Sequence, residues 1–462
     1  MTVPFPLTQA LAKFVSAPTF GADEQAACAI AKTGFIDTIA TMLAGCNEPV
    51  VGIVRSHVAA NQIPAEAPVV PFTGAMLPAA QAACVNAVAA HALDFDDVAL
   101  SAHTSTVLVP VILAEGHLLN VSGAEALRAY VVGYEVWAEL FAREPDPYHL
   151  KGWHPTGVFG TVGAAAAVAY LHRLSAEQTQ QALAIAASMA SGLVANFGTM
   201  TKPFHAGRAA ACAIEAVRLS QLGLTSAPDV FEHPAGYLNA LSPAGRVDRT
   251  RAASGLGKSL RILKTGLSIK RYPVCYSGHR VIDGVLEIAE RENLQPEQVS
   301  RVRVSMGPAQ VSMLRNHSPH TSLEAKFSAE FAVAAALVAR QVGLAELSDS
   351  FVARDDVRTL MGKVVVDTTD RACPIDPAFS YADRVQIELT DGRSFDSGDI
   401  RFARGNSELP MDAVSLQNKF LDCVAAGPSP DKSLPGAVLY ERIVDLENLA
   451  SLRQLFVLEP LS

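Results

Sequence analysis

Apolar residues recur at three- and four-residue spacing from residue 6 to about residue 265, and no alternating runs of apolar and polar positions interrupt them. This spacing is typical of amphipathic helices. It predicts helices over residues 23–44, 79–93, 124–142, 161–172, 178–194 and 205–222. Because alanine is abundant in these stretches, helix axes can approach closely, and we expect a dense helical bundle.

The pattern changes after about residue 268. Short runs that alternate or are rich in β-branched side chains predict strands at residues 300–306, 363–368 and 384–395. The last of these is two alternating runs around an Asp-Gly pair, which favours a hairpin. Two helical patterns, 279–292 and 325–341, lie among the strands. This part of the chain is therefore expected to be an α+β domain.

A chain of 462 residues exceeds the size at which one core remains efficient, so more than one domain is expected. After Pro410 a helical pattern returns. We therefore predict a mainly α protein, in which a large helical domain is made of residues 1–267 and 404–462. The smaller α+β domain, residues 268–403, is inserted between its two parts.

Composition narrows the possible partners. The net charge is -9 and no run of Lys and Arg is present, which argues against nucleic acid or an anionic membrane as a partner. A few cations in one pocket could still hold a small anion. The N-terminus lacks the pattern of a signal peptide, and no stretch approaches the uninterrupted apolar length of a membrane span. We expect a cytoplasmic protein.

Several chemistries lack their motifs. The seven cysteines are scattered, odd in number and without a C-x-x-C pair, which argues against a disulfide framework and structural zinc. No H-E-x-x-H, G-x-S-x-G or Walker loop is present. The glycines of GVFGTVG (157–163) miss the G-x-G-x-x-G spacing and follow a proline rather than a strand, so we expect them to allow close helix packing.

Titratable residues lie at turns beside predicted helix ends. Asp94 follows the helix at 79–93, and His103 precedes the helical pattern VPVILAEGHLL. His154 and Lys202 each precede a proline, which disfavours helical backbone at both positions and predicts a helix start just after them. His279 begins the helix at 279–292. These five residues are our candidates for catalysis.

The helix ends give these residues an electrostatic consequence. A helix N-terminus carries partial positive charge, so cations placed there are unfavourable unless an anion joins them. We therefore expect a cage for a small molecule with two or three carboxylates. Asp94 is the mirror case, since a carboxylate at a helix C-terminus is destabilised when charged, which suits a general base.

The same stretches supply further candidates for binding the carboxylates. They are Lys270, Arg271, Tyr276, His205 and Thr104. Asp96 and Asp97 are expected to face solvent or to cap a helix. Their D-x-D-D run could bind a divalent ion, but no second carboxylate cluster completes a site, so we predict no metal.

Four stretches together resemble the MmgE/PrpD family. They are DFDD (94–97), GWHPTG (152–157), TKPFHAG (201–207) and KRYPVCYSGH (270–279). The family includes 2-methylcitrate dehydratases, cis-aconitate decarboxylases and iminodisuccinate epimerases. The resemblance implies a helical domain with a smaller lid domain, a site in the cleft between them, a homodimer, and catalysis without metal or organic cofactor. The positions that match the family's active-site motifs are Asp94, His103, His154, Lys202 and His279.

This chain also departs from the decarboxylase-like pattern. Val98 stands where those relatives have a threonine, and Phe331 stands at a position that looks like their tyrosine. The gap to His103 is one residue shorter, and Thr104 replaces the usual proline after it. The loss of two hydroxyls argues against cis-aconitate decarboxylation, and the stretches EAKFS and FGTMTKP are more similar to the epimerase branch.

The reactions of the family share the problem of making or quenching a carbanion next to a carboxylate. We expect a cofactor-independent acid/base lyase of the dehydratase or decarboxylase type, acting on a small di- or tricarboxylic acid. Lys202 and His154 would bind carboxylates, Asp94 and His103 would transfer protons on one face, and His279 on the other. An epimerase is the alternative, and a helical protein that binds a dicarboxylate without turnover is the second.

Overall fold

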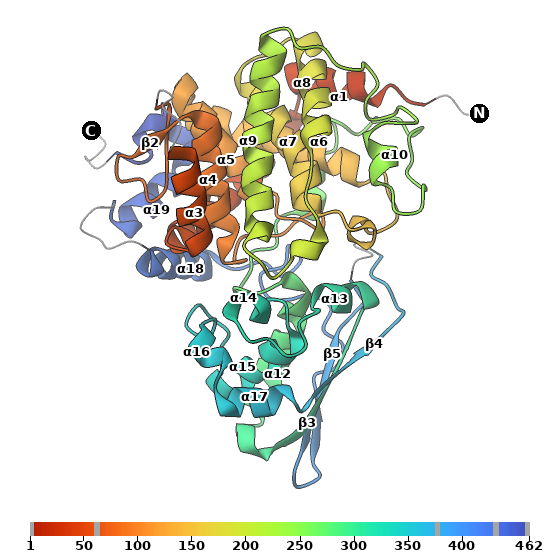
Figure 1. Ribbon diagram of the computed structural model, residues 1–462, viewed down its shortest axis with the longest axis vertical. Helices are drawn as coiled ribbons and strands as arrows, with labels where there is room; N and C mark the ends of the chain where they lie inside the picture. Colours follow the sequence, from red (N-terminus) through yellow and green to blue (C-terminus); the bar gives the residue numbers. More distant parts are fainter. Residues whose placement is uncertain (1–3, 60–64, 375–378, 428–433, 458–462) are drawn as a thin grey trace. The chain divides into compact units, whose positions relative to one another are not determined.

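The computed structural model describes residues 4–59, 65–374, 379–427 and 434–457. The chain divides into two compact units, and the described part is mainly helical, as predicted (Figure 1). The first unit comprises Met1–Ala195, Lys202–Leu267 and Asp412–Ser462. The second comprises Asn196–Thr201 and Ser268–Met411, so it runs beyond residue 403 and takes in a short earlier segment.

Helices build the first unit, and both ends of the chain contribute to it. In order they are α1 (Leu7–Ser16), α2 (Glu24–Gly45), α3 (Pro49–Ala59), α4 (Ala79–Ala92), α5 (Ser105–Leu119), α6 (Gly123–Phe141), α7 (Pro155–Leu171), α8 (Ala176–Met189), α9 (Thr201–Gln221), α10 (Tyr237–Leu241), α11 (Arg261–Thr265), α18 (Ala413–Ala426) and α19 (Gly436–Val444). Two short strands, β1 (Ala67–Pro68) and β2 (Met76–Leu77), pair antiparallel between α3 and α4.

Glycines allow α6 and α7 to pack backbone to backbone (Figure 1). A Cβ atom added at Gly133 would lie 2.8 Å from the carbonyl oxygen of Gly163, and one added at Gly160 would lie 3.1 Å from the ring of Trp137. A side chain at either position would push the helices apart. The expectation that the glycines of 157–163 serve close helix packing is confirmed for this helix pair.

One core helix corrects the expectation that no stretch is long and apolar enough to span a membrane. Among the described residues, Gly21–Gly45 passes that test of length and composition. In its most apolar window 67% of the residues are buried inside the protein, and Asp37, in the middle of α2, is also buried. The ammonium of Lys419, on α18, donates to Asp37 across 2.6 Å. An apolar helix with a paired charge at its centre is typical of a protein core.

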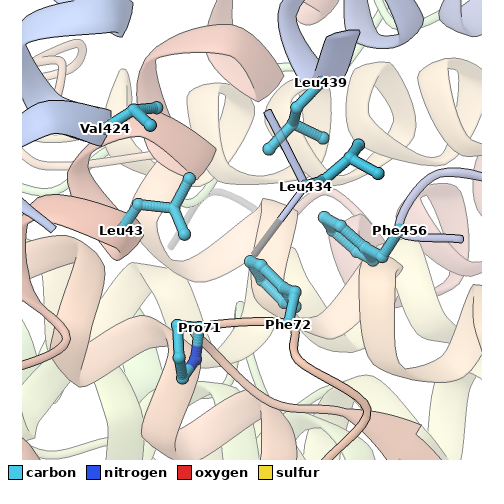
Figure 2. A pocket seen from close by; sticks show the side chains of 7 residues that line it. All are labelled: Leu43, Pro71, Phe72, Val424, Leu434, Leu439 and Phe456. Atoms are coloured by element: carbon cyan, nitrogen blue, oxygen red, sulfur yellow. The ribbon is translucent and has the colours of Figure 1, made fainter. Parts of the chain in front are cut away.

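An apolar contact joins the C-terminal segment to the turn between β1 and β2. The rings of Phe72 and Phe456 stack with centroids 3.8 Å apart (Figure 2). The space beside them is about 10 Å³, enough for one water molecule at most. Apolar side chains line it, namely Leu43, Pro71, Phe72, Val424, Leu434, Leu439 and Phe456. The contact therefore closes the fold and offers no room for a substrate.

The second unit is built on a four-stranded sheet. Its strands are β3 (Val299–Met306), β4 (Val364–Thr368), β5 (Arg384–Leu389) and β6 (Ser394–Asp396), in the order β4-β3-β5-β6. β3 pairs parallel with β4 and antiparallel with β5. The predicted hairpin is confirmed, because β5 and β6 pair antiparallel around Gly392, whose φ is 90°.

Among the described residues of this unit, six helices accompany the sheet. They are α12 (His279–Arg291), α13 (Pro308–Met313), α14 (Ser322–Ala325), α15 (Ala329–Ala339), α16 (Asp349–Val352) and α17 (Asp355–Met361). Alternate residues of β5 are buried, and α12 contacts that strand while α15 contacts β4. The unit is thus α+β, as the sequence pattern predicts.

Candidate active site

The loop between α4 and α5 carries the predicted Asp94 and His103. Asp94, Leu100 and Ser101 have left-handed backbone, with φ between 52° and 54°, and Ala99 and Ala102 bond each other to close the loop. Left-handed backbone is uncommon outside glycine, although aspartate tolerates it better than most residues. The loop folds inward, so that Asp94 is only 3% exposed. Strained backbone of this kind is frequent at functional sites.

Three predicted residues meet in the first unit. The Nζ atom of Lys202 donates to Oδ1 of Asp94 at 2.6 Å, and Nε2 of His103 lies 3.5 Å from the same oxygen. All three side chains are buried. A buried ammonium beside a carboxylate interacts far more strongly than the same pair in water, because little solvent screens it.

The position of Lys202 differs from the prediction. The residue lies inside the first turn of α9, which begins at Thr201, and not before the helix. Pro203 is tolerated there because the N–H groups of a first turn have no intrahelical partner to lose. The positive N-terminus of α9 and the positive side chain of Lys202 therefore lie together, and the negative charge of the Asp94 carboxylate balances them.

Asp96 and Asp97 correct a second expectation. Both were expected to face solvent or to cap a helix, but both side chains are fully buried. Each carboxylate oxygen of Asp96 lies 3.0 Å from Nδ1 of His91, and Oδ2 also lies 3.0 Å from Nδ1 of His103. The rings of His91 and His103 are 4.3 Å apart. Asp96 thus lies between two imidazoles.

His91 was missed by the sequence reasoning. It stands in the last turn of α4, a helix whose other residues are almost all apolar and buried. The available signal was a lone titratable residue at the end of an alanine-rich helix, next to the run of acids at 94–97. Burial lowers the pKa of His91 to about 3, despite the attraction of Asp96, so the ring is neutral near pH 7.

The pKa of Asp96 moves in the opposite direction from that of an isolated buried acid. Burial alone would raise it, but His103 and then His91 stabilise the carboxylate and hold its pKa well below the usual range. Asp96 is therefore a charged, acceptor-only group at neutral pH.

His154 and His205 form a second pair of imidazoles. Their Nδ1 atoms are 3.0 Å apart, so one ring donates to the other. His154 caps α7, with Pro155 as the first helical residue, as predicted. Its backbone N–H donates to the carbonyl of Gly192, where an added Cβ would lie 3.2 Å from the ring of His205. The close backbone at Gly192 thus fixes both rings.

Both rings of this pair are neutral, which corrects the expectation that His154 adds a cation at a helix start. Burial and then Lys202 lower the pKa of His154 well below its usual range, and the same two causes lower that of His205 to about 4. The pair can therefore offer N–H donors and lone pairs to a ligand, but no charge. Lys202 is the cation of this group.

Thr104 is placed beside the same cluster. It caps α5 and is fully buried, and the N–H of its neighbour His103 donates to the hydroxyl of Thr156 at 3.1 Å. This bond ties the loop that carries His103 to the first turn of α7. The loop and the start of α7 are therefore held together by polar contacts.

In the second unit, His279 stands at the start of α12 and is fully buried. Its ring lies 5.1 Å from that of Tyr272 and 4.9 Å from that of Tyr276. Nε2 is 3.3 Å from the carbonyl oxygen of Val274, which can only accept, so the hydrogen lies on Nε2. Aromatic contacts thus orient His279.

The remaining candidates also belong to the second unit. Lys270 is fully buried, whereas Arg271 is exposed. The hydroxyl of Tyr276 accepts from the side-chain amide of Asn406 at 2.9 Å. Phe331, the residue at the expected tyrosine position, is buried in α15 with its ring 6.3 Å from that of Phe351. Its side chain is packed within the core of this unit.

One group of side chains in the described part of the chain has the spacing of metal ligands. It consists of His91, Asp94, Asp96 and His103, whose ligand atoms lie within 4.8 Å of one another. The ammonium of Lys202 already contacts Asp94, and Asp96 already faces two imidazoles. A metal ion would have to displace these partners. The absence of a metal stays a prediction, which a chelator tests.

Comparisons with known proteins agree with the sequence motifs. The MmgE/PrpD N-terminal domain matches residues 9–250, and the MmgE/PrpD C-terminal domain matches residues 272–434. The human cis-aconitate decarboxylase is 32% identical over 360 residues, which cover 74% of this chain and 72% of that protein. The mouse enzyme is 29% identical over 82% of this chain and 78% of its own length, and the Aspergillus terreus enzyme is 25% identical over 82% of both. The protein therefore belongs to the MmgE/PrpD family, among its lyases.

Proposed function

We propose that this protein decarboxylates cis-aconitate or a closely related unsaturated tricarboxylic acid. The observation that carries the proposal is the buried Lys202–Asp94 pair beside His103, in a chain 32% identical to the human cis-aconitate decarboxylase. The missing hydroxyls at Val98 and Phe331 weigh less, because Phe331 is packed in the core of the second unit.

The chemistry needs one cation and one proton donor. When CO₂ leaves such an acid, the electrons of the broken C–C bond form a new C=C bond, and the electrons of the old C=C bond move to the carbon beside another carboxylate. That carbon then takes up a proton. Positive charge next to the carboxylate stabilises the intermediate, and an acid on the correct face completes the product.

The first unit supplies both groups. Lys202 is the buried cation, and a carboxylate of the substrate would compete with Asp94 for its ammonium. His103, with Nε2 facing the same pair, is the group we assign to proton transfer. The neutral rings of His154 and His205 are suited to donate hydrogen bonds to substrate oxygens. The role of His279 stays a prediction that rests on the family resemblance.

Proton NMR in D₂O tests the proposal. The purified protein is incubated separately with cis-aconitate, citrate, 2-methylcitrate and iminodisuccinate, and released CO₂ is measured in parallel. We expect cis-aconitate to lose one carbon and the product to carry deuterium at a carbon next to a carboxylate. Hydration, or deuterium uptake without carbon loss, would instead place the protein with the dehydratases or the epimerases.

Two controls accompany this experiment. Lys202→Met protein, purified in the same way, identifies any activity of a contaminating enzyme. A cis-aconitate sample without protein measures spontaneous isomerisation and decarboxylation. If the wild-type protein releases no more CO₂ than these controls, the proposed function is wrong.

A further inference from the structure

Asp96 differs from the other acids of its loop in what surrounds it. Asp94 contacts an ammonium, whereas the fully buried Asp96 lies between the Nδ1 atoms of two imidazoles, each at 3.0 Å. Such a carboxylate does not touch the solvent and does not contact Lys202 at hydrogen-bond distance. Its effect on chemistry must therefore pass through the rings.

The carboxylate decides which nitrogen of each ring carries hydrogen. An ionised carboxylate only accepts, so a ring nitrogen 3.0 Å from it is attracted to it only when that nitrogen carries hydrogen. The opposite tautomer would place a nitrogen lone pair against the oxygen lone pairs of Asp96. Each ring therefore carries its hydrogen on Nδ1, and the Nε2 atom of a neutral ring keeps its lone pair.

His91 holds the other side of this carboxylate. Among the described residues, no hydrogen-bond partner reaches its Nε2 atom. The tautomer with hydrogen on Nδ1 is the less costly one for His91. Its N–H group is bonded to Asp96, and only the lone pair of Nε2 is left without a partner, whereas the other tautomer would leave a buried N–H group unbonded. His91 is thus a neutral clamp that fixes the orientation of Asp96.

We propose that Asp96 is a positioning residue that keeps the hydrogen of His103 on Nδ1, so that Nε2 faces the Asp94–Lys202 pair as the proton-transfer atom. This inference rests on the proposed function only in assigning proton transfer to His103. In its acidic form His103 carries hydrogen on both nitrogens and gives the Nε2 proton to the substrate carbanion. The ring becomes neutral, Asp96 stays ionised throughout, and Nε2 is recharged with a proton from water.

Asp97 provides a matched control. It directly follows Asp96 in the sequence and is just as deeply buried. Its carboxyl contacts the hydroxyl of Ser105, however, and not an imidazole. A general effect of removing a buried carboxylate should appear in both Asp→Asn variants. An effect transmitted through His103 should appear only in Asp96→Asn.

The experiment combines kinetics with NMR of protein labelled with ¹⁵N at histidine, in which the signal of His103 is assigned by its loss in His103→Gln. In the wild-type protein we expect the ¹⁵N shifts of neutral His103 to report hydrogen on Nδ1. In Asp96→Asn the amide can donate to Nδ1, so we expect the hydrogen of His103 to move to Nε2. The value of kcat should then fall by about 10²- to 10⁴-fold, as in other enzymes whose catalytic histidine is held in the wrong tautomer. KM should change little, and Asp97→Asn should leave the tautomer and the pH–rate profile as in the wild type.

The outcomes separate this inference from the proposed function. Hydrogen on Nε2 of His103 in the wild-type protein would overturn the inference even if the protein decarboxylates cis-aconitate. Equal effects of Asp96→Asn and Asp97→Asn on the pH–rate profile would also overturn it. Apart from the His103→Gln variant that assigns the signal, measuring the tautomer of the wild-type protein needs neither substrate nor folded Asp96→Asn, so it decides the inference if cis-aconitate is not turned over or if Asp96→Asn fails to fold.

Discussion

The two sides of the loop at residues 94–97 show how differently the same buried side chain can behave. Asp96 and Asp97 are neighbours in the sequence and are both fully buried. The imidazoles beside Asp96 hold its pKa well below the usual range. Burial, and then the nearby Asp37, raise the pKa of Asp97 well above it. The surroundings of Asp96 thus favour its charged form, and those of Asp97 favour its neutral form.

Their neighbours account for the difference. The side of the loop with Asp94 and Asp96 faces Lys202, His91 and His103, which stabilise negative charge. The opposite side is tied to the framework of the unit. There, Asp97 bonds the hydroxyl of Ser105, which in turn lies 2.6 Å from that of Tyr130, and Lys419 donates to the carbonyl of Phe95 at 2.8 Å. Burial alone therefore does not mark a catalytic carboxylate, whereas burial among cations and imidazoles does.

The largest expected effect comes from removing the cation of the first side. Lys202→Met should lower kcat/KM for the decarboxylation by about 10³-fold, because it removes preorganised charge stabilisation from a water-poor site. It should also destabilise the fold, since Asp94 loses the ammonium at 2.6 Å. Steady-state kinetics and urea unfolding measure the two effects.

A double variant separates those two effects. Lys202→Met combined with Asp94→Asn removes both charges of the pair, so stability should return toward the wild type while activity stays lost. Wild-type activity in the folded single variant would contradict the assignment of Lys202.

The next largest effect is expected on stability, from the side of the loop that Lys419 ties to the rest of the unit. Lys419→Met leaves Asp37 as a buried charge without its ammonium and should lower the free energy of unfolding by about 3–5 kcal/mol. Adding Asp37→Asn should recover most of the loss. Urea unfolding of the single and double variants measures this, and equal stability of Lys419→Met and wild type would show that the pair does not hold the framework.

A pH series tests the neutral imidazoles. The folded pKa of His205 is about 4, whereas an unfolded histidine titrates near about 6.5, so below pH 6.5 the unfolded chain takes up a proton that the folded chain refuses. The contribution of His205 to stability is therefore complete above pH 6.5 and falls by up to about 1.4 kcal/mol per pH unit down to pH 4. His205→Gln should show a correspondingly shallower loss in urea unfolding at pH 7, 6 and 5. Parallel curves for the two proteins would mean that His205 titrates normally when folded.

Asp97→Asn should have a smaller effect. Because burial and the nearby Asp37 raise its pKa and so favour the neutral carboxyl, an amide of similar shape should replace it at little cost, and the free energy of unfolding should change by less than about 1 kcal/mol. Urea unfolding at pH 7 checks this. A loss of several kcal/mol would show that Asp97 is ionised in the folded protein and would remove the contrast with Asp96.

The smallest expected effect is none. Dialysis against a chelator should leave the rate of decarboxylation unchanged, because the ammonium of Lys202 occupies the cation position beside Asp94. Atomic emission of the purified protein gives an independent count of bound metal. Loss of activity that returns with one divalent ion would make the four clustered side chains a metal site.

Much of this structure could be predicted from local sequence. The helices α4, α6 and α12 follow from apolar periodicity, and the hairpin between β5 and β6 follows from the Asp-Gly turn. The predictions failed where the answer depends on distant residues. The run of acids at 94–97 resembles an exposed loop, but Lys202 bonds Asp94 from 108 residues away and Lys419 bonds the carbonyl of Phe95 from 324 residues away.

In the candidate site, too, some residues could be predicted from the sequence and others could not. Helix ends and the family motifs select Asp94, His103 and Lys202, which meet in the structure. Neither signal selects His91 or Asp96. An alanine-rich helix gives no indication that its one histidine faces a carboxylate, and that contact depends on how the loop after α4 folds back through left-handed backbone.

A crystal structure of the protein with bound cis-aconitate, or with an unreactive saturated analogue, tests the central claim most directly. The account predicts a carboxylate of the acid within hydrogen-bond distance of Nζ of Lys202 and a carbon of the ligand beside Nε2 of His103. An acid bound elsewhere, with Lys202 contacting only Asp94, would contradict it.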